Sequence, residues 1–229
     1  IPQETRIHYV VTNGGKAPNV VPEFAEVYYY VRHPEKTMAI SIFERIVKAA
    51  EGAALGTETK MDYEIIGGTH DLLINKTLAT NMQTNLEKVG GVMYTTEENI
   101  FAKKIQSSLL GNPASIDSAA IVKPLHVEKN QGSTDVGDVS YVVPTVGVNT
   151  ATWVTGTSAH SWQAIACGGT DIGIKGMIVA SKTIAFTAID LFTIPELIKK
   201  AKEEFIQTKG GYQYKALLGD RQPALNYRD

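Results

Sequence analysis

Residues 132–169 read GSTDVGDVSYVVPTVGVNTATWVTGTSAHSWQAIACGG, and the interpretation of the whole chain starts from this stretch. An acidic turn leads into a strand-like apolar run, Val139–Val148, and a second strand-like run, Thr150–Thr155, stops at a glycine. His160 follows on a loop of small residues, ahead of a long helical pattern. A histidine displayed between a strand and a helix can reach a metal ion or a substrate, although a lone histidine there is more often an ordinary loop residue.

The composition is that of a globular protein with one large domain or two smaller ones: 229 residues, 43% hydrophobic and 20% charged. A formal net charge of −2, without any Lys/Arg-rich run, argues against nucleic-acid binding. The single cysteine, Cys167, excludes an intrachain disulfide and agrees with a reducing cytoplasm, where we expect the protein. The most apolar run, Ile172–Phe192, contains Lys175, Lys182 and Asp190, so we expect no membrane partner.

The first third of the chain alternates between strand and helix patterns. Arg6–Thr12 alternates and is β-branched, and a turn at Asn13-Gly14-Gly15 separates it from a second predicted strand, Asn19–Val31. An amphipathic helix is predicted after Pro34-Glu35, and Lys60–Ile66 alternates again, as a third strand would. Strand, strand, helix, strand is three quarters of a split β-α-β unit, so a partial ferredoxin-like domain is predicted here.

Helices dominate the prediction for the remainder. Capping residues indicate where three of them begin, namely Asn75, Thr95 or Thr96, and Thr193. Gly173–Phe192 is predicted as a buried or half-buried helix, and Gly111–Gly132 as a long surface loop.

The residue types that could carry chemistry do not by themselves define a reaction. No dinucleotide-binding, phosphate-loop, zinc-protease or serine-hydrolase motif occurs. No two of the five histidines have helical metal-ligand spacing, and we expect His33 and His70 to be solvated beside turns. Asp135 and Asp138 could form a carboxylate pair, but aspartate in a glycine-flanked turn is first of all a turn residue. Cys167 has no evident base beside it, which favours a small core residue over a nucleophile.

Three further residues each leave two interpretations open. His126 falls in the long loop, where a structural role is favoured over a functional one. His8 lies in a predicted strand, and a half-buried strand residue is the favoured interpretation. Arg32 could bind a carboxylate bidentately, or be a surface arginine near an acidic neighbour. From its residues alone, the chain is an α+β protein without an assignable reaction.

Three segments of the chain resemble a known family. RIHYVVTNGGKAPNVVPEFAEVYYYVR, residues 6–32, resembles the lid (dimerisation) domain of zinc-type metallopeptidases and amidohydrolases that include carboxypeptidase G, succinyl-diaminopimelate desuccinylase and aminoacylase. GSTDVGDVS, residues 132–140, and GTSAHSWQ, residues 156–163, resemble two motifs in the second half of that family's catalytic domain. The similarity covers nearly all of residues 1–208 and is strongest to the p-aminobenzoyl-glutamate hydrolase branch.

This resemblance implies an α/β protein, with a partial ferredoxin-like lid at residues 1–72 and the C-terminal part of a metallopeptidase catalytic domain at residues 73–229. It also implies a small-molecule amide substrate, such as p-aminobenzoyl- or acyl-glutamate, and a homodimer formed through the lid. The cofactor that it implies for the parent enzyme is a divalent metal, zinc or manganese.

Residue by residue, the resemblance implies one metal ligand and a set of substrate contacts. His160 matches the last ligand of the family's two-metal site. The substrate contacts that it implies are Asn19, Arg32, His8, Ser133, Thr134, Asp135, Gly168 and Gly169. No residue here matches the catalytic glutamates or the other metal ligands, which in the family precede the lid.

We therefore expect a C-terminal fragment, or one half of a split enzyme, that is inactive alone and holds no complete metal site. The alternative is a non-catalytic dimerisation or binding module, and a weaker one is a truncated product without a function of its own.

Overall fold

The computed structural model describes residues 1–128, 132–218, 222 and 225, and their backbone divides into two compact units. Unit 1 comprises the described residues of 1–72, 128–142 and 213–229. Unit 2 comprises residues 73–127 and 143–212. The first division falls between Leu72 and Leu73, and two later segments join the first unit. The assignment of these units to a lid and a catalytic domain stays a prediction.

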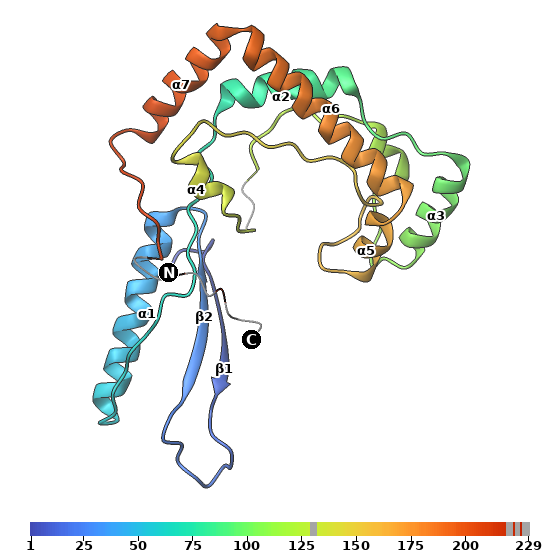
Figure 1. The fold of residues 1–229 in the computed structure, drawn as a ribbon. Coiled ribbons are helices and arrows are strands. Elements are labelled where there is room, and N and C mark those ends of the chain that lie inside the picture. Colours follow the sequence, from blue (N-terminus) through green and yellow to red (C-terminus); the bar gives the residue numbers. More distant parts are fainter. Residues whose placement is uncertain (129–131, 219–221, 223–224, 226–229) are drawn as a thin grey trace. The chain divides into compact units, whose positions relative to one another are not determined.

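Unit 1 is built on a hairpin and one long helix, drawn in blue in Figure 1. Strand β1 (Arg6–Asn13) pairs antiparallel with β2 (Glu26–Arg32), and Arg6 lies opposite Arg32. Helix α1 (Lys36–Gly56) follows and contacts β2. The predicted hairpin and the predicted helix after Pro34 are therefore confirmed.

Two strand predictions in unit 1 are wrong. The second strand begins at Glu26 rather than Asn19, since residues 14–25 form the hairpin loop, where Pro22 has no N–H to give to a ladder. Lys60–Ile66 is not a strand, and the ring of Tyr63 instead meets Phe43 of α1 edge-on at 5.7 Å between ring centres. A strand requires a neighbour for its N–H and C=O groups, and no third strand lies in the part of unit 1 that the structure describes. The ferredoxin-like topology therefore stays a prediction.

Unit 2 is helical, and two of its predicted helix starts are confirmed. Its elements are α2 (Lys76–Val89), α3 (Thr96–Ser107), the 3-10 helix η1 (Ile116–Ala120), α5 (Trp162–Gly168), α6 (Asp171–Thr193) and α7 (Pro195–Lys209). The Oδ1 atom of Asn75 accepts the Leu78 N–H at 3.0 Å and caps α2. Thr95 and Glu98 form a capping box at the start of α3.

The predicted cap of the last helix is one residue off, whereas its proline is in place. Ile194 occupies the cap position and Pro195 is the first residue of α7. Thr193 ends α6 instead, where its hydroxyl donates to the Ile189 carbonyl at 2.8 Å. A threonine hydroxyl that bonds to its own preceding turn is not available to cap the next helix.

Residues 132–169 contain two short helices, α4 (Val136–Ser140) and α5, and no strand. Helix α4 belongs to unit 1, and residues 141–155 are irregular. The strand-like runs Val139–Val148 and Thr150–Thr155 are thus wrong as strand predictions, because no strand of the described chain pairs with them. The predicted loop 111–132 holds η1, and its residues 129–131 lie outside the described part.

The core of unit 2 is small and apolar. Its buried members are Ala102, Ile105, Ile116, Val154, Cys167 and Ile172. The side chain of Cys167 is fully buried among them, which confirms the small core residue expected at that position.

Candidate functional site

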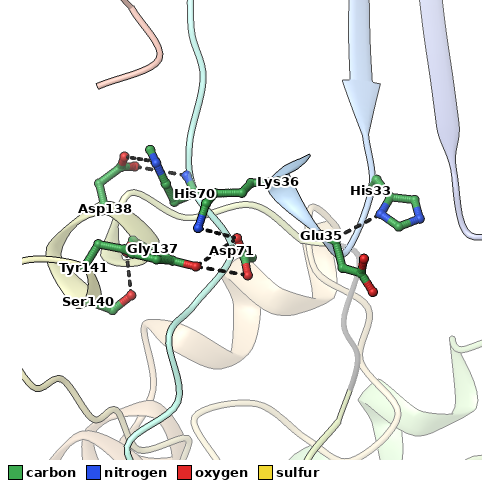
Figure 2. Close-up of polar contacts among 9 residues, drawn as sticks. All are labelled: His33, Glu35, Lys36, His70, Asp71, Gly137, Asp138, Ser140 and Tyr141. Carbon is green, nitrogen blue, oxygen red and sulfur yellow. Dashed lines mark hydrogen bonds and ion pairs between the residues drawn. The ribbon is translucent and has the colours of Figure 1, made fainter. Parts of the chain in front are cut away.

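A largely buried polar cluster in unit 1 joins the end of the first segment to α4 (Figure 2). His70 is 4% exposed, and its Nδ1 lies 2.7 Å from Asp138 Oδ1. The backbone N–H of His70 also donates to Asp138 Oδ2 at 3.4 Å. Next to it, Asp71 accepts the Tyr141 hydroxyl at 3.3 and 3.4 Å. Lys36 lies 3.9 Å from Asp71 Oδ1, with its Nζ 3.7 Å from the centre of the Tyr141 ring.

We call these five residues, His70, Asp71, Asp138, Tyr141 and Lys36, the His70 cluster. Their charges and hydrogen bonds orient the side chains relative to one another. A carboxylate against one ring nitrogen sets the tautomer of an imidazole and the direction in which the ring faces. Burial lowers the pKa of the Lys36 ammonium below its usual value, and the nearby Asp71 carboxylate opposes that shift. The cluster therefore fixes α4 against residues 70 and 71 by two adjacent polar pairs, but it does not by itself specify a reaction.

The His70 cluster corrects one sequence prediction, the solvated His70, and decides against the alternative of a carboxylate pair at Asp135 and Asp138. His70 is buried rather than solvated, and Asp138 pairs with it rather than with Asp135. The two partners are 68 positions apart, so no local pattern signals the contact. The glycine that allows the two segments to approach closely is Gly137 of α4, where an added Cβ would meet the His70 carbonyl oxygen.

The predicted substrate loop, Ser133 to Asp135, is an exposed turn that leads into α4. The hydroxyl of Thr134 accepts the Val136 N–H at 3.2 Å, and the carbonyl of Asp135 accepts the Asp138 N–H at 3.0 Å. The position of this loop therefore depends on α4, which the His70 cluster holds.

The three predicted residues of the hairpin lie at different places along it. Asn19 is in the exposed loop, whereas Arg32 ends β2, with its guanidinium carbon 5.3 Å from the centre of the Tyr30 ring. The seven residues of β2 span roughly 20 Å at about 3.3 Å per residue, so the hairpin does not bring Asn19 and Arg32 together. His8 lies opposite Tyr30 and is exposed, so the half-buried interpretation of this residue is wrong.

In unit 2, His160 has an unusual, left-handed backbone conformation. Of the non-glycine residues that the structure describes, only His160 and Glu58 have a positive φ, which is 58° for His160. The next residue, Ser161, caps α5 by accepting the Ala164 N–H at 3.2 Å, and its hydroxyl donates to the Ser158 carbonyl at 2.7 Å. A left-handed residue persists where its surroundings enforce it, and such residues gather at functional sites. The backbone of this exposed residue is therefore set by the turn that leads into α5.

The predicted glycine pair closes α5. Gly168 is its last residue and Gly169 its cap, with an ordinary φ of −85°. Close packing next to the pair instead involves Gly173, where an added Cβ would lie 2.5 Å from the Gly168 carbonyl oxygen. The substrate contacts at Gly168 and Gly169 stay a prediction.

Two other features of unit 2 do not build a site. Cys167 is buried near Tyr94, whose pKa is raised to about 12, chiefly by burial and further by Cys167 and Glu98. Such a phenol does not act as a base toward the thiol near neutral pH. A hollow of 530 Å³ beside α3 includes Thr96, Lys103 and Asp117 in its lining, but none of the predicted site residues.

The described residues do not fit a metal site. Among them, no group of three or more histidine, cysteine, aspartate or glutamate side chains could hold a metal ion. A catalytic zinc needs about three protein ligands, and His160 is the single ligand that the resemblance implies for this chain.

Comparison with known proteins finds relatives but no matching family model. The chain is 35% identical over 238 residues to a p-aminobenzoyl-glutamate hydrolase subunit of Escherichia coli (strain K12), a match that spans 93% of the chain and 50% of that protein. It is 28% identical over 205 residues to the Xaa-Arg dipeptidases of Mus musculus and Homo sapiens, which spans 87% of the chain and 40% of theirs. The chain thus spans about half the length, or less, of the curated relatives it matches.

Proposed function

Because the chain belongs to the amidohydrolase and peptidase family of p-aminobenzoyl-glutamate hydrolase and Xaa-Arg dipeptidase, we propose that it is part of an enzyme that hydrolyses an amide bond to an amino acid. The observation that carries this proposal is the 35% identity, which extends over 93% of the chain. By their names, both relatives act on a bond of this kind, in an aroyl-amino acid or in a dipeptide. An aroyl- or acyl-glutamate is the proposed substrate class.

In this proposal, His160 supplies one ligand of a divalent zinc or manganese site, and the other ligands come from residues outside these 229. The left-handed, exposed position of His160 before α5 supports this role, since it displays the imidazole away from the core. The failure of the described residues to form a ligand group supports the need for ligands from elsewhere.

Arg32 is proposed to anchor a substrate carboxylate, because a guanidinium binds a carboxylate through two parallel hydrogen bonds. Asn19 and His8 on the same hairpin, together with Ser133, Thr134 and Asp135 of the loop before α4, are the further proposed contacts in unit 1. Gly168 and Gly169 are those proposed for unit 2. The proposed location is the cytoplasm.

The test is a fusion in which this chain replaces the matching half of the Escherichia coli hydrolase, while the uncovered half is kept. We expect the fusion to cleave p-aminobenzoyl-glutamate, and His160→Asn to lower both the rate and the bound zinc or manganese. Arg32→Ala is expected to raise KM, because it removes a carboxylate anchor. A fusion with native-like circular dichroism that cleaves neither this compound nor Xaa-Arg dipeptides would refute the proposal.

Elemental analysis of the chain alone tests where the ligands come from. After dialysis against zinc and manganese, we expect close to no bound metal, since one histidine does not retain an ion. A stoichiometry near one per chain would mean that residues such as His126 or Asp135 complete a site, and the chain would then be a metalloprotein by itself.

A second candidate function, a non-catalytic dimerisation module, is favoured by the hairpin. Large apolar side chains are exposed on both strands, including Tyr9 at 69%, Val11 at 54% and Tyr30 at 51%. A lone two-stranded sheet is marginally stable, and its open edges favour pairing with another chain. Light scattering of the purified chain tests this: a dimer that Val11→Lys dissociates, combined with an inactive fusion, would favour the module over the enzyme.

A further inference from the structure

Helix α4 is too short and too exposed to fix its own position. It has five residues, whereas an isolated helix needs about 12–15 residues to be even marginally stable in water. Its valines, Val136 and Val139, are 41% and 50% exposed, so no apolar face attaches it to the rest of unit 1. Its buried residues are Gly137 and Ser140. Contacts with other segments therefore have to hold the helix.

Residues 70 and 71 supply such contacts (Figure 2). His70 Nδ1 lies 2.7 Å from Asp138 Oδ1, and the His70 N–H donates to Asp138 Oδ2 at 3.4 Å. A carboxylate only accepts hydrogen bonds, so the Nδ1–H group of His70 is the donor in the shorter contact. At Gly137 the two backbones touch, because an added Cβ there would meet the His70 carbonyl oxygen. The helix is thus held to His70 by both side chain and backbone.

The ring of His70 is itself fixed by its surroundings. Its centre lies 5.1 Å from that of the Tyr141 ring and 5.2 Å from that of the Tyr214 ring. The side chain of His70 has no exposed surface. A side chain without exposed surface cannot touch a substrate, so an effect of His70 on a reaction has to pass through the residue that it holds.

That residue, Asp138, is bonded directly to the predicted substrate loop. Its N–H donates to the Asp135 carbonyl at 3.0 Å. The Gly137 N–H donates to the Thr134 carbonyl at 3.3 Å, and the Val136 N–H to the Thr134 hydroxyl at 3.2 Å. A movement of Asp138 therefore reaches the exposed loop through a single backbone hydrogen bond.

We propose that His70 is a positioning residue, which sets the place of the loop Ser133–Asp135 through Asp138 and thereby sets the affinity for the substrate. The inference rests on the proposed function in one respect, that this loop contacts the substrate. The two aspartates then have separate roles: Asp135 is exposed toward the substrate, and Asp138 ties the loop to His70. A displaced loop weakens the binding of substrate and transition state alike, so KM should rise while kcat stays nearly unchanged.

The first test measures KM and kcat in the fusion with the uncovered half of the Escherichia coli hydrolase. His70→Leu removes the donor, and we expect KM to rise roughly tenfold, the lower end of what loss of a supporting residue costs. His70→Asn keeps an N–H group near the place of Nδ1 and should restore most of the affinity. Tyr141→Phe is the matched control, because it removes the hydroxyl that bonds to Asp71 but keeps the ring beside His70. Its KM should equal that of wild type.

Asp138→Ala, alone and combined with His70→Leu, tests whether His70 acts through Asp138. If it does, KM of the double variant should equal that of the more affected single variant, because the second substitution removes a contact already lost. Single effects that multiply in the double variant would overturn the proposal. A wild-type KM in His70→Leu would also overturn it, as would a fall in kcat without a change in KM.

Hydrogen exchange of the chain alone tests the link between His70 and the loop without any reaction. In wild type, the amides of Val136 and Asp138 should exchange more slowly than in the free peptide 132–141, because they donate to Thr134 and Asp135. His70→Leu should abolish this protection, whereas His70→Asn and Tyr141→Phe should keep it. Unchanged exchange of the α1 amides shows that unit 1 stays folded in each variant. Equal protection in wild type and His70→Leu, or none in either, would overturn the link.

The two measurements separate this inference from the proposed function. A fusion that hydrolyses nothing, combined with lost protection in His70→Leu, would refute the proposed function and uphold the link between His70 and the loop. An active fusion in which His70→Leu keeps both its protection and its KM would refute the inference and leave the hydrolase in place.

Discussion

The carbonyl oxygen of Ala151 lies against Gly176 of α6, 2.5 Å from the point where a Cβ atom at residue 176 would stand. An irregular segment and a helix thus touch backbone to backbone, and the Thr150 hydroxyl bonds to the carbonyl of the same glycine. This contact depends on the missing side chain and leads to the first prediction.

Gly176→Ala should destabilise unit 2 although alanine is the better helix former, because the methyl group meets a backbone oxygen that cannot turn away. Overpacking of this kind costs roughly 1–3 kcal/mol. Gly52→Ala in α1 is the matched control: no atom lies within 4 Å of its added Cβ, and a gain of about 0.5–1 kcal/mol is expected. Urea unfolding of both variants measures the difference, and equal effects would contradict the packing argument.

Asn75→Ala should lower the free energy of unfolding by about 1–2 kcal/mol through loss of the α2 cap. The same amide also donates to the Ala201 carbonyl at 2.8 Å, which would be left without this partner. Asn75→Asp keeps the capping oxygen but loses the donor, so its stability should fall between wild type and Asn75→Ala. Chemical denaturation followed by circular dichroism gives the order, and a reversed order would exclude the cap as the cause.

Acid should destabilise unit 2 partly through Asp190. Hydrogen bonds from Asn85 first and Asn81 second, with the charge of Lys88, hold the pKa of the Asp190 carboxyl below its usual value. The stabilisation is therefore present above the unfolded pKa of about 4 and is lost as pH falls through the lower native pKa.

Asp190→Asn should flatten the fall in stability over that acid range, while the exposed Glu203→Gln should follow wild type. Unfolding midpoints measured from pH 6 downward, by roughly one pH unit per step, resolve the two curves. If Asp190→Asn keeps the full acid slope, the assignment to this carboxylate is wrong.

His160→Gly should be more stable than His160→Ala. Both remove the imidazole, but the left-handed backbone at φ 58° disfavours any residue with a Cβ, by roughly 1–2 kcal/mol. Thermal unfolding of the two variants, each compared with wild type, measures this difference. If the alanine variant equals or exceeds the glycine variant, residue 160 does not hold a strained conformation in solution.

Local chemistry in the sequence predicted much of the helical structure. Asn75 and the Thr95–Glu98 capping box mark the first turns of α2 and α3, because a cap involves residues only three positions apart. The turn signal after Thr12 likewise predicted the hairpin, although the loop proved longer than the signal. Thr193 was misassigned because its hydroxyl has an alternative acceptor in the preceding turn, at Ile189.

The candidate site was less predictable. The resemblance indicated His160, but nothing local indicated its left-handed backbone. His70 was missed because its partner, Asp138, is 68 residues away, and burial of a polar residue depends on such a partner.

The sequence by itself determined the long helices α1, α2, α3, α6 and α7, where α2 and α3 begin and that residues 6–32 form a hairpin, since these features depend on caps, turns and periodicity within a few residues. Only the tertiary structure decided that His70 is buried against Asp138, that α6 packs by its glycines and threonines, and that the strand-like run 143–149 has no ladder partner in the described chain. The physical reason is that burial and strand pairing are properties of two segments at once, and the second segment lies far away in the sequence.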